Sequence, residues 1–232
     1  MENQAIYNKV FESNRQWIEQ NQRNNPGLFK LLAEEQRPDF LYIGCSDSRV
    51  HPNQIMGLKP GEVFIHRNIA NVINPTDLSA LSVINYAVEN LEVKFIVVCG
   101  HYDCGGIAAA LDDSDHGMLN PWLRSIRDVY QIHKLELDSI DDDDERYRRF
   151  VELNVYEQCR NVVKMVDVQK SYLKNGYPRV AGWIFDMRDA HLYDLNFDFE
   201  GELEVLREVY TVKMKGDKEH EEKTEGTNVG LD

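Results

Sequence analysis

The sequence predicts an α/β fold in which a mainly parallel central sheet is flanked by helices. Two short apolar runs, Phe40–Gly44 and Phe95–Cys99, have the length and composition of strands that are buried on both faces. A helical pattern over Thr76–Leu91 joins a further strand, Glu62–His66, to the second run, and strands connected in this way pair in parallel. Both apolar runs end in reactive polar residues, and α/β sheets place their sites outside the carboxyl ends of strands.

Length and charge restrict the class of protein. A chain of 232 residues with 42% hydrophobic residues is long enough for one well-filled domain, which we place at residues 1–212. Its net charge of -14, from 40 acidic and 26 basic residues, disfavours nucleic acid and anionic membranes as partners. No apolar run approaches the roughly 20 residues of a membrane span. Four cysteines and an N-terminus unlike a signal peptide favour a reducing, cytoplasmic location.

The first 36 residues form a predicted helical arm. Residues 3–22 carry apolar side chains at roughly helical spacing among polar ones, which is typical of an amphipathic helix that packs on a partner or on the body of the protein. Asn25 and Pro26 are a favourable N-cap and first-turn pair for a second helix before the first strand.

The middle of the chain alternates helices with the strands described above. Pro52–Met56 is a predicted short helix, and residues from Ile107 to Leu111 start another after a pair of glycines. Asn120 and Pro121 repeat the helix-start signal before a pattern that reaches His133.

The last third of the chain contains the remaining elements. We expect the acidic run Asp141–Glu145 to be a solvated loop, and Asp144–Asn175 to be one long helix stopped by a glycine and a proline. Arg179–Asp186 and His191–Leu195 are predicted to be the last two strands and to form a hairpin. Residues 213–232 have the composition of a mobile charged tail.

Three potential metal ligands follow the two apolar runs. Cys45 comes directly after the first, while His101 and Cys104 lie three residues apart in the turn after the second. If the two strands are neighbours, these side chains converge, and two thiolates with one imidazole suit a tetrahedral zinc ion, one per chain. The fourth position would then belong to water, to substrate or, in a closed form, to Asp47.

A carboxylate and a guanidinium accompany the first ligand. Asp47 and Arg49 lie two residues apart and are positioned to pair. While paired, Arg49 holds the carboxylate off the metal, and Asp47 can accept a hydrogen bond from a zinc-bound hydroxide. Gly105 and Gly106 allow close backbone approach, and their N–H groups should favour the thiolate of Cys104.

Zinc with an open position lowers the pKa of bound water to about 7 and so generates hydroxide that attacks electrophilic carbon. Two thiolate ligands cancel the charge of the metal, which should weaken this effect. We therefore predict an activity that rises toward alkaline pH.

The stretches Cys45–Arg49 and Gly100–Gly106 resemble those of the beta-class carbonic anhydrases, zinc enzymes that interconvert carbon dioxide and bicarbonate. The similarity extends over about residues 27–195. It implies that the three potential ligands bind zinc and that the aspartate and arginine form a catalytic dyad. It also implies a mainly parallel sheet and subunits that pair through N-terminal helices and sheet edges, which we expect to give a dimer or tetramer.

One bacterial subgroup of that family resembles the chain most and is regulated by bicarbonate in a non-catalytic pocket of tryptophan, valine and arginine. Val50 and Arg67 match that pocket, whereas Tyr42 stands at the position of the tryptophan and His51 where a proline is common. A regulatory bicarbonate site is thus a hypothesis from the resemblance.

Two alternatives to carbon dioxide hydration stay open at the level of sequence. The same site chemistry would serve hydrolysis of an analogue such as carbon disulfide, and a zinc-bound or bicarbonate-sensing protein without turnover would keep the ligands. The other reactive side chains near the two runs, and one on the long helix, are predicted to be ordinary core or loop residues: His51, His66, Cys99, Tyr102, Asp103 and Cys159.

Overall fold

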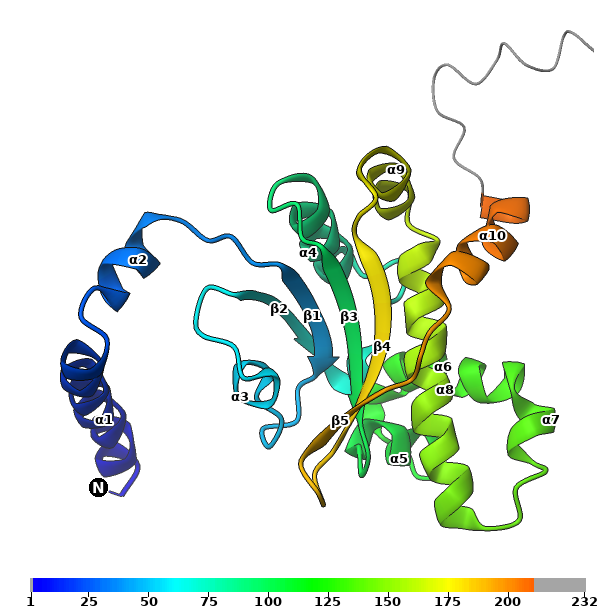
Figure 1. The fold of residues 1–232 in the computed structure, drawn as a ribbon. Helices are drawn as coiled ribbons and strands as arrows, with labels where there is room; N and C mark the ends of the chain where they lie inside the picture. The colour runs from blue at the N-terminus through cyan, green and yellow to red at the C-terminus, as the bar shows by residue number, and fades with distance from the viewer. Residues whose placement is uncertain (1, 211–232) are drawn as a thin grey trace, which may run out of the picture.

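A five-stranded sheet forms the centre of the computed structural model, which describes residues 2–210 (Figure 1). The strand order is β2 (Val63–Asn68), β1 (Phe40–Cys45), β3 (Phe95–His101), β4 (Arg179–Asp186) and β5 (His191–Asp194). The first four strands are parallel and β5 is antiparallel to β4, so the α/β prediction and the terminal hairpin are confirmed. The predicted tail at 213–232 lies outside the described residues.

Helices cover both faces of this sheet. Those of the body are α3 (Pro52–Met56), α4 (Leu78–Glu89), α5 (Gly105–Leu111), α6 (Asn120–Ile132), α7 (Lys134–Leu137), α8 (Asp143–Val163), α9 (Val166–Asn175) and α10 (Phe199–Tyr210). Helix α8 runs along β3 and β4, with α6 and α10 packed beside it, while α4 packs on α9. Among residues 2–210, no helix combines the length and apolarity that crossing a membrane requires.

The alternation of side chains along the strands divides the core between the two faces. Leu41 and Ile43 of β1 are fully buried in the larger cluster, under α4, α6 and α8. Tyr42, between them, belongs to a smaller cluster on the opposite face, with Val97 of β3 and side chains of α3. Both faces of β1 are therefore covered, which explains its unbroken apolar sequence.

The N-terminal arm extends away from the sheet (Figure 1) and consists of α1 (Glu2–Asn24) and α2 (Leu28–Glu34). The Trp17 ring of α1 lies 5.3 Å from the Phe29 ring of α2, centroid to centroid. Helix α2 begins later than Asn25 and Pro26 predict, because Gly27 takes a left-handed conformation (φ 102) and becomes the residue before the first turn.

The predicted single helix over 144–175 is wrong, since the chain breaks between α8 and α9. Met165 is extended (φ -71, ψ 130), and the side-chain amide of Gln169 donates to the carbonyl of Val163 at 2.9 Å. This bond satisfies a carbonyl that the end of α8 leaves without a helical partner. The break lets α8 pack along the sheet while α9 packs on α4.

Two other expectations for this part of the chain need correction. The acidic run is exposed, as predicted, but only its first two residues precede the helix: the Asp142 side chain caps α8 by accepting from the Glu145 N–H at 2.8 Å, and the following acids occupy the first turn. Negative charge at a helix N-terminus is favourable, so the run starts the helix. Helix α10, which the sequence analysis did not predict, buries Phe199, Leu203 and Leu206 against α8.

Candidate metal centre

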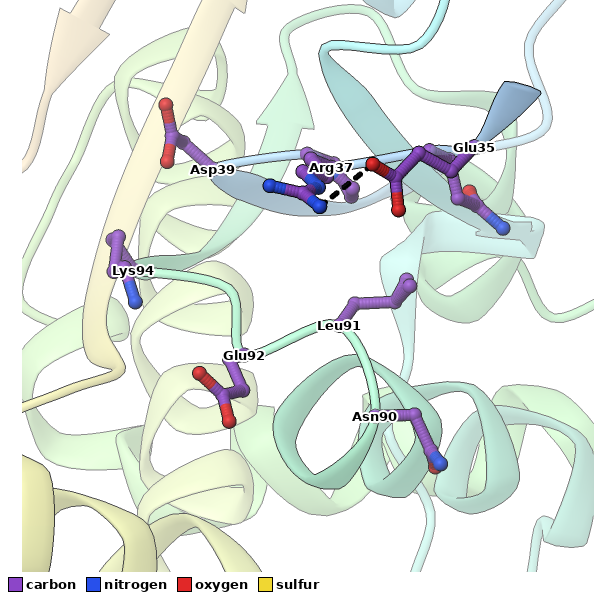
Figure 2. A pocket seen from close by; sticks show the side chains of 9 residues that line it. Glu35, Arg37, Asp39, Asn90, Leu91, Glu92 and Lys94 are labelled. Atoms are coloured by element: carbon purple, nitrogen blue, oxygen red, sulfur yellow. Dashed lines mark ion pairs between the residues drawn. The ribbon is translucent and has the colours of Figure 1, made fainter. Parts of the chain in front are cut away.

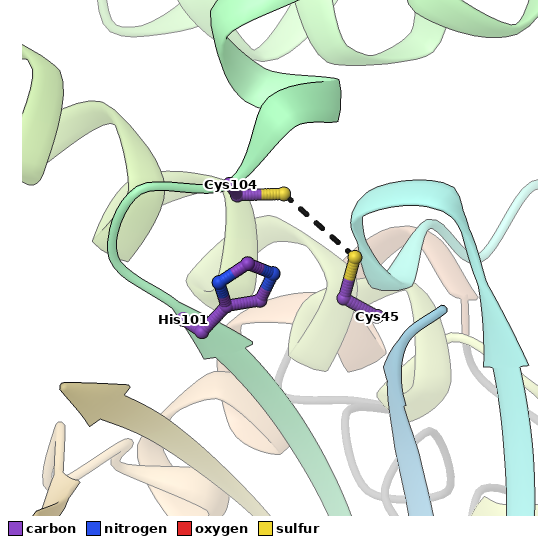
Figure 3. A group of neighbouring side chains, drawn as sticks. All are labelled: Cys45, His101 and Cys104. Carbon is purple, nitrogen blue, oxygen red and sulfur yellow. Dashed lines mark hydrogen bonds between the residues drawn. The ribbon is translucent and has the colours of Figure 1, made fainter. Parts of the chain in front are cut away.

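The carboxyl ends of β1 and β3 bring the three predicted ligands together. The two strands pair directly, so Cys45 at the end of β1 faces His101 at the end of β3, and Cys104 follows in the turn before α5 (Figure 3). All three side chains are buried, and their ligand atoms lie within 4.8 Å of one another. The condition on which the prediction depended, that the strands are neighbours, is met.

The geometry of this cluster fits zinc. The sulfurs of Cys45 and Cys104 are 3.8 Å apart, and two sulfurs bound tetrahedrally at about 2.3 Å would be separated by about 3.8 Å. The Nδ1 atom of His101 lies 2.9 Å from the Tyr102 carbonyl, while Nε2 is buried and has no hydrogen-bond partner within residues 2–210. A buried acceptor beside two thiols is the arrangement that a metal ion completes.

The two thiols titrate as a pair. Hydrogen bonding with Cys104 lowers the pKa of the Cys45 thiol against the effect of burial, and the same contact raises the pKa of Cys104. A divalent cation bound here would need both sulfurs as thiolates and would release the protons that they hold. The N–H groups of Gly106 and Ile107 point to the sulfur of Cys104 and favour its thiolate.

Asp47 and Arg49 form the predicted pair. The Arg49 side chain donates through Nε to Oδ1 at 2.9 Å and through Nη2 to Oδ2 at 2.7 Å, and its backbone N–H donates to Oδ1 at 3.0 Å. These side-chain bonds hold the pKa of the Asp47 carboxyl well below its usual range, although burial opposes them. Asp47 Oδ2 is also 3.9 Å from His101 Nε2, so the ionised carboxylate borders the cluster.

The two glycines after Cys104 differ in their surroundings. A Cβ at Gly106 would lie 2.6 Å from Ile69 Cγ2 and 3.1 Å from the Cβ of Ala70, whereas a Cβ at Gly105 would meet nothing within 4 Å. The expected close backbone approach therefore applies to Gly106 only. Ala70 itself has a positive φ of 60, which places it against the start of α5.

The three residues of the hypothetical bicarbonate pocket lie near β1. Tyr42 and Val50 are buried in the smaller apolar cluster, and the Tyr42 hydroxyl has no hydrogen-bond partner among the described residues. Arg67 of β2 donates to the carbonyls of Cys45 at 2.8 Å and Asp47 at 2.6 Å. Bracing of the ligand loop by Arg67 is a role that the sequence analysis missed, because a contact between β2 and that loop has no local signal.

A polar hollow of about 370 Å³ lies at the opposite end of the sheet (Figure 2). It is lined by Asp39 and Lys94, which precede β1 and β3, and by an ion pair in which Arg37 Nη2 is 2.7 Å from Glu35 Oε1. Since the cysteines and histidine lie at or after the carboxyl ends of the same strands, this hollow is separate from the metal cluster.

Comparison with known proteins assigns the family. A family model described as "Carbonic anhydrase" matches residues 40–192. The chain is 58% identical to a carbonic anhydrase of Emericella nidulans over 209 residues, covering 90% of this chain and 92% of the relative. Its fold matches the crystal structure of the beta-carbonic anhydrase CafA of Aspergillus fumigatus with a TM-score of 0.83 at 39% identity, covering 89% and 99% of the two chains. The chain belongs to the beta-class carbonic anhydrases.

Two further comparisons agree with this family. A carbonic anhydrase of Saccharomyces cerevisiae is 30% identical over 191 residues, covering 79% of this chain and 86% of the relative. Crystal structures of two tetrameric beta-carbonic anhydrases from Sordaria macrospora match with a TM-score of 0.79 at 39% identity, covering 83% of this chain and 98% of that chain. The predicted fold, enzyme class and zinc dependence are confirmed by these matches together with the Cys-His-Cys cluster.

Proposed function

We propose that the protein catalyses the reversible hydration of carbon dioxide to bicarbonate and a proton. The observation that carries this function is the buried cluster of Cys45, His101 and Cys104 at adjoining strand ends in a beta-class carbonic anhydrase fold. Neither carbon disulfide hydrolysis nor a zinc-bound protein without turnover is favoured, because the relatives are carbonic anhydrases and the aspartate–arginine pair is intact.

The two thiols and His101 Nε2 would hold the zinc ion. When bound, zinc supplies a Lewis acid that makes water nucleophilic near neutral pH. Asp47 Oδ2, which borders His101 Nε2, accepts a hydrogen bond from the attacking water and orients it toward the carbon of the substrate. Arg49 occupies both carboxylate oxygens from the solvent side, so Asp47 stays ionised and is held off the ligand cluster. If that pair broke, Asp47 would be free to act as a fourth ligand.

The chain offers a matched control for the role of Arg49. Arg188 makes the same set of bonds to Asp186, with its backbone N–H and Nε to Oδ1 at 3.0 and 3.2 Å and Nη2 to Oδ2 at 3.2 Å. Asp186 also has a second arginine partner, Arg148, so its pairing survives the loss of Arg188. The two motifs thus share geometry, and Asp47 is the carboxylate that borders the ligands, with Oδ2 3.9 Å from His101 Nε2.

The test is stopped-flow measurement of carbon dioxide hydration on zinc-quantified proteins. We expect Asp47→Ala and Arg49→Ala to lower kcat by about 100-fold or more, since a positioned acceptor contributes at least this much. Arg188→Ala should keep the turnover of the unmodified protein. Zinc-loaded protein that turns over no carbon dioxide at any pH would refute the hydratase, and equal losses in both arginine variants would refute the dyad.

We also propose that the protein self-associates as a dimer or tetramer through its N-terminal arm. Ile6, Val10 and Phe11 of α1 are 62%, 63% and 52% exposed, an apolar face on a helix that extends from the body. A second copy of the chain is the proposed partner, because the related Sordaria structures are tetrameric. Sedimentation should show a lower mass for Val10→Glu than for Lys9→Glu, a charge change one residue away; equal masses would contradict the proposal.

Regulation by bicarbonate at Tyr42, Val50 and Arg67 is a further proposal, taken from the resemblance to the bicarbonate-regulated subgroup. An anion at Arg67 would compete with the carbonyls of Cys45 and Asp47 for the guanidinium. Loss of these bonds would alter the position of Asp47, and in this way the anion would affect the dyad. Arg67→Ala should then remove inhibition by bicarbonate. Unchanged inhibition and an unchanged acid-side pH profile would rule the site out.

We place the protein in the cytoplasm and treat residues 1–212 as one catalytic unit with the arm at 1–36. All four cysteines are free and buried, and Cys45 must stay reduced to bind zinc, which suits a reducing compartment. Cell fractionation with antibody detection tests the location; recovery from a secreted or organellar fraction would refute it.

A further inference from the structure

The orientation of the histidine ligand depends on the residue that follows it. His101 Nδ1 lies 2.9 Å from the Tyr102 carbonyl, the distance of an N–H donor and its acceptor. A proton on Nδ1 leaves the lone pair on Nε2, the atom that faces the two sulfurs. The carbonyl of Tyr102 thus selects the tautomer that binds a metal.

Helix α8 holds the side chain of Tyr102 on two sides. The hydroxyl donates to Glu152 Oε1 at 2.7 Å, and the guanidinium carbon of Arg148 lies 3.5 Å from the centre of the ring. Arg148 and Glu152 are one turn apart, so both side chains leave the same face of α8. Arg148 is itself tied to Asp186 at the end of β4, at 3.3 Å.

The same helix also contacts the other ligand of this turn. The Tyr147 hydroxyl donates to the Cys104 carbonyl at 2.9 Å. In between, the backbone N–H of Tyr102 donates to the Phe185 carbonyl of β4 at 3.2 Å. The turn that supplies His101 and Cys104 is therefore attached at Tyr102 to both α8 and β4, and at Cys104 to α8.

We propose that Tyr102 is a positioning residue for zinc. Its side chain is held between Arg148 and Glu152, and its carbonyl fixes the ring of His101 in the metal-binding orientation. The inference rests on the proposed function, since it assigns His101 to zinc. It adds a role for α8, a helix about 50 residues further along the chain. The Tyr102 hydroxyl is bonded to Glu152, so its effect on His101 passes through the Tyr102 carbonyl.

The test compares Tyr102→Phe with Tyr156→Phe. Tyr156 is also a tyrosine whose hydroxyl donates to a glutamate, Glu202, but that bond joins α8 to α10. The readouts are the zinc Kd, from competition with a chelator, and the visible spectrum of the Co²⁺-substituted protein. We expect Tyr102→Phe to raise the zinc Kd by about 10-fold, at the lower end of losses from outer-shell partners, and to shift the Co²⁺ bands. Tyr156→Phe should change neither.

Variants of the glutamate separate this role from a general loss of stability. Glu152→Gln keeps an acceptor for the hydroxyl, so its zinc Kd should stay within about twofold of that of the unmodified protein. Glu152→Ala removes the acceptor and should behave like Tyr102→Phe. Because the two residues act as one contact, the double variant Tyr102→Phe with Glu152→Ala should bind zinc no more weakly than either single variant, within about twofold.

Equal zinc Kd values for Tyr102→Phe and Tyr156→Phe would overturn the proposal. The proposal would also be overturned if the losses of zinc affinity in the two single variants multiplied in the double variant, because Tyr102 and Glu152 would then not act through one contact. Zinc stoichiometry and carbon dioxide turnover of the unmodified protein test the proposed function separately. An unmodified protein that binds no zinc or shows no turnover would refute that function before any variant is compared.

Discussion

Replacement of the glycine at the start of α5 tests the packing of the metal centre most directly. Gly106→Ala would place a methyl group 2.6 Å from Ile69 Cγ2, well inside the 3.5–4.0 Å of an ordinary carbon–carbon contact. The opposing loop cannot retreat easily, because Trp122 Nε1 donates to the Ile69 carbonyl at 2.9 Å and Asn154 Nδ2 to the Ala70 carbonyl at 3.0 Å.

The expected cost follows from this confinement. Overpacking of a rigid site costs about 1–3 kcal/mol, and the bonds that hold the loop place Gly106→Ala in the upper half of that range. For a chain of this size, about 2–3 kcal/mol corresponds to a fall in Tm of about 4–12 °C. Gly105→Ala is the matched control: its methyl group meets nothing within 4 Å, and alanine restricts the unfolded chain more than glycine does. The free energy of unfolding of Gly105→Ala should therefore exceed that of the unmodified protein by up to about 1 kcal/mol.

The assay is urea unfolding of both variants at equal protein concentration and equal zinc content, since zinc and self-association each add to apparent stability. Gly106→Ala should unfold at a lower urea concentration than the unmodified protein, and Gly105→Ala at an equal or higher one. Equal midpoints for the two variants would refute the steric reasoning and the description of the α5 start.

Three further predictions concern the metal, the cysteines and the helix break. Removal of zinc by a chelator should lower the free energy of unfolding, which urea unfolding measures. The expected loss is about 2.7 kcal/mol relative to protein in free zinc at 100 times the zinc Kd. Iodoacetamide at about pH 8 should leave Cys99 and Cys159 unmodified in folded protein, because burial raises the pKa of Cys99 to about 12 and that of Cys159 well above its ordinary value. Gln169→Ala should cost about 1–3 kcal/mol in thermal unfolding, since the Val163 carbonyl loses its partner.

Each of these predictions has a control. Unchanged unfolding after zinc removal would contradict a metal that joins β1 to the turn after β3. Labelling of all four cysteines in urea shows that the reagent works, and early labelling of Cys99 or Cys159 without urea would contradict their burial. Lys170→Ala changes the exposed neighbour of Gln169 and should be neutral; a similar loss there would mean that α9 responds to any truncation.

Short-range chemistry made much of the site predictable. Cys45 ends one apolar run, and His101 with Cys104 ends another, so the ligand set is visible in the sequence. The Asp47–Arg49 pair is also local, because the carboxylate and the guanidinium that it bonds belong to residues two positions apart. The alternation of predicted helices and strands was sufficient to predict the α/β fold, since hydrophobic periodicity shows which side of each local element is buried.

Tertiary structure decided what depends on contacts between distant segments. The pairing of β1 with β3 brings the ligands together, and no local pattern states which strands adjoin. Lys164 and Met165 end one helix and begin another because α8 follows the sheet while α9 packs on α4, although the sequence there continues a helical pattern. Gly106 faces Ile69 and Ala70, whereas a Cβ at Gly105 would meet nothing within 4 Å, and no local pattern distinguishes the two glycines.

The residues that support the ligands illustrate the same division. Nothing in the sequence around Arg67 indicates that its guanidinium braces the carbonyls of Cys45 and Asp47, and nothing around Glu152 indicates a bond to Tyr102. The sequence by itself determined which side chains can bind zinc, because that follows from residue type and spacing. Only the folded chain decided what holds them in place, because those hydrogen bonds join residues that lie 20 to 50 positions apart.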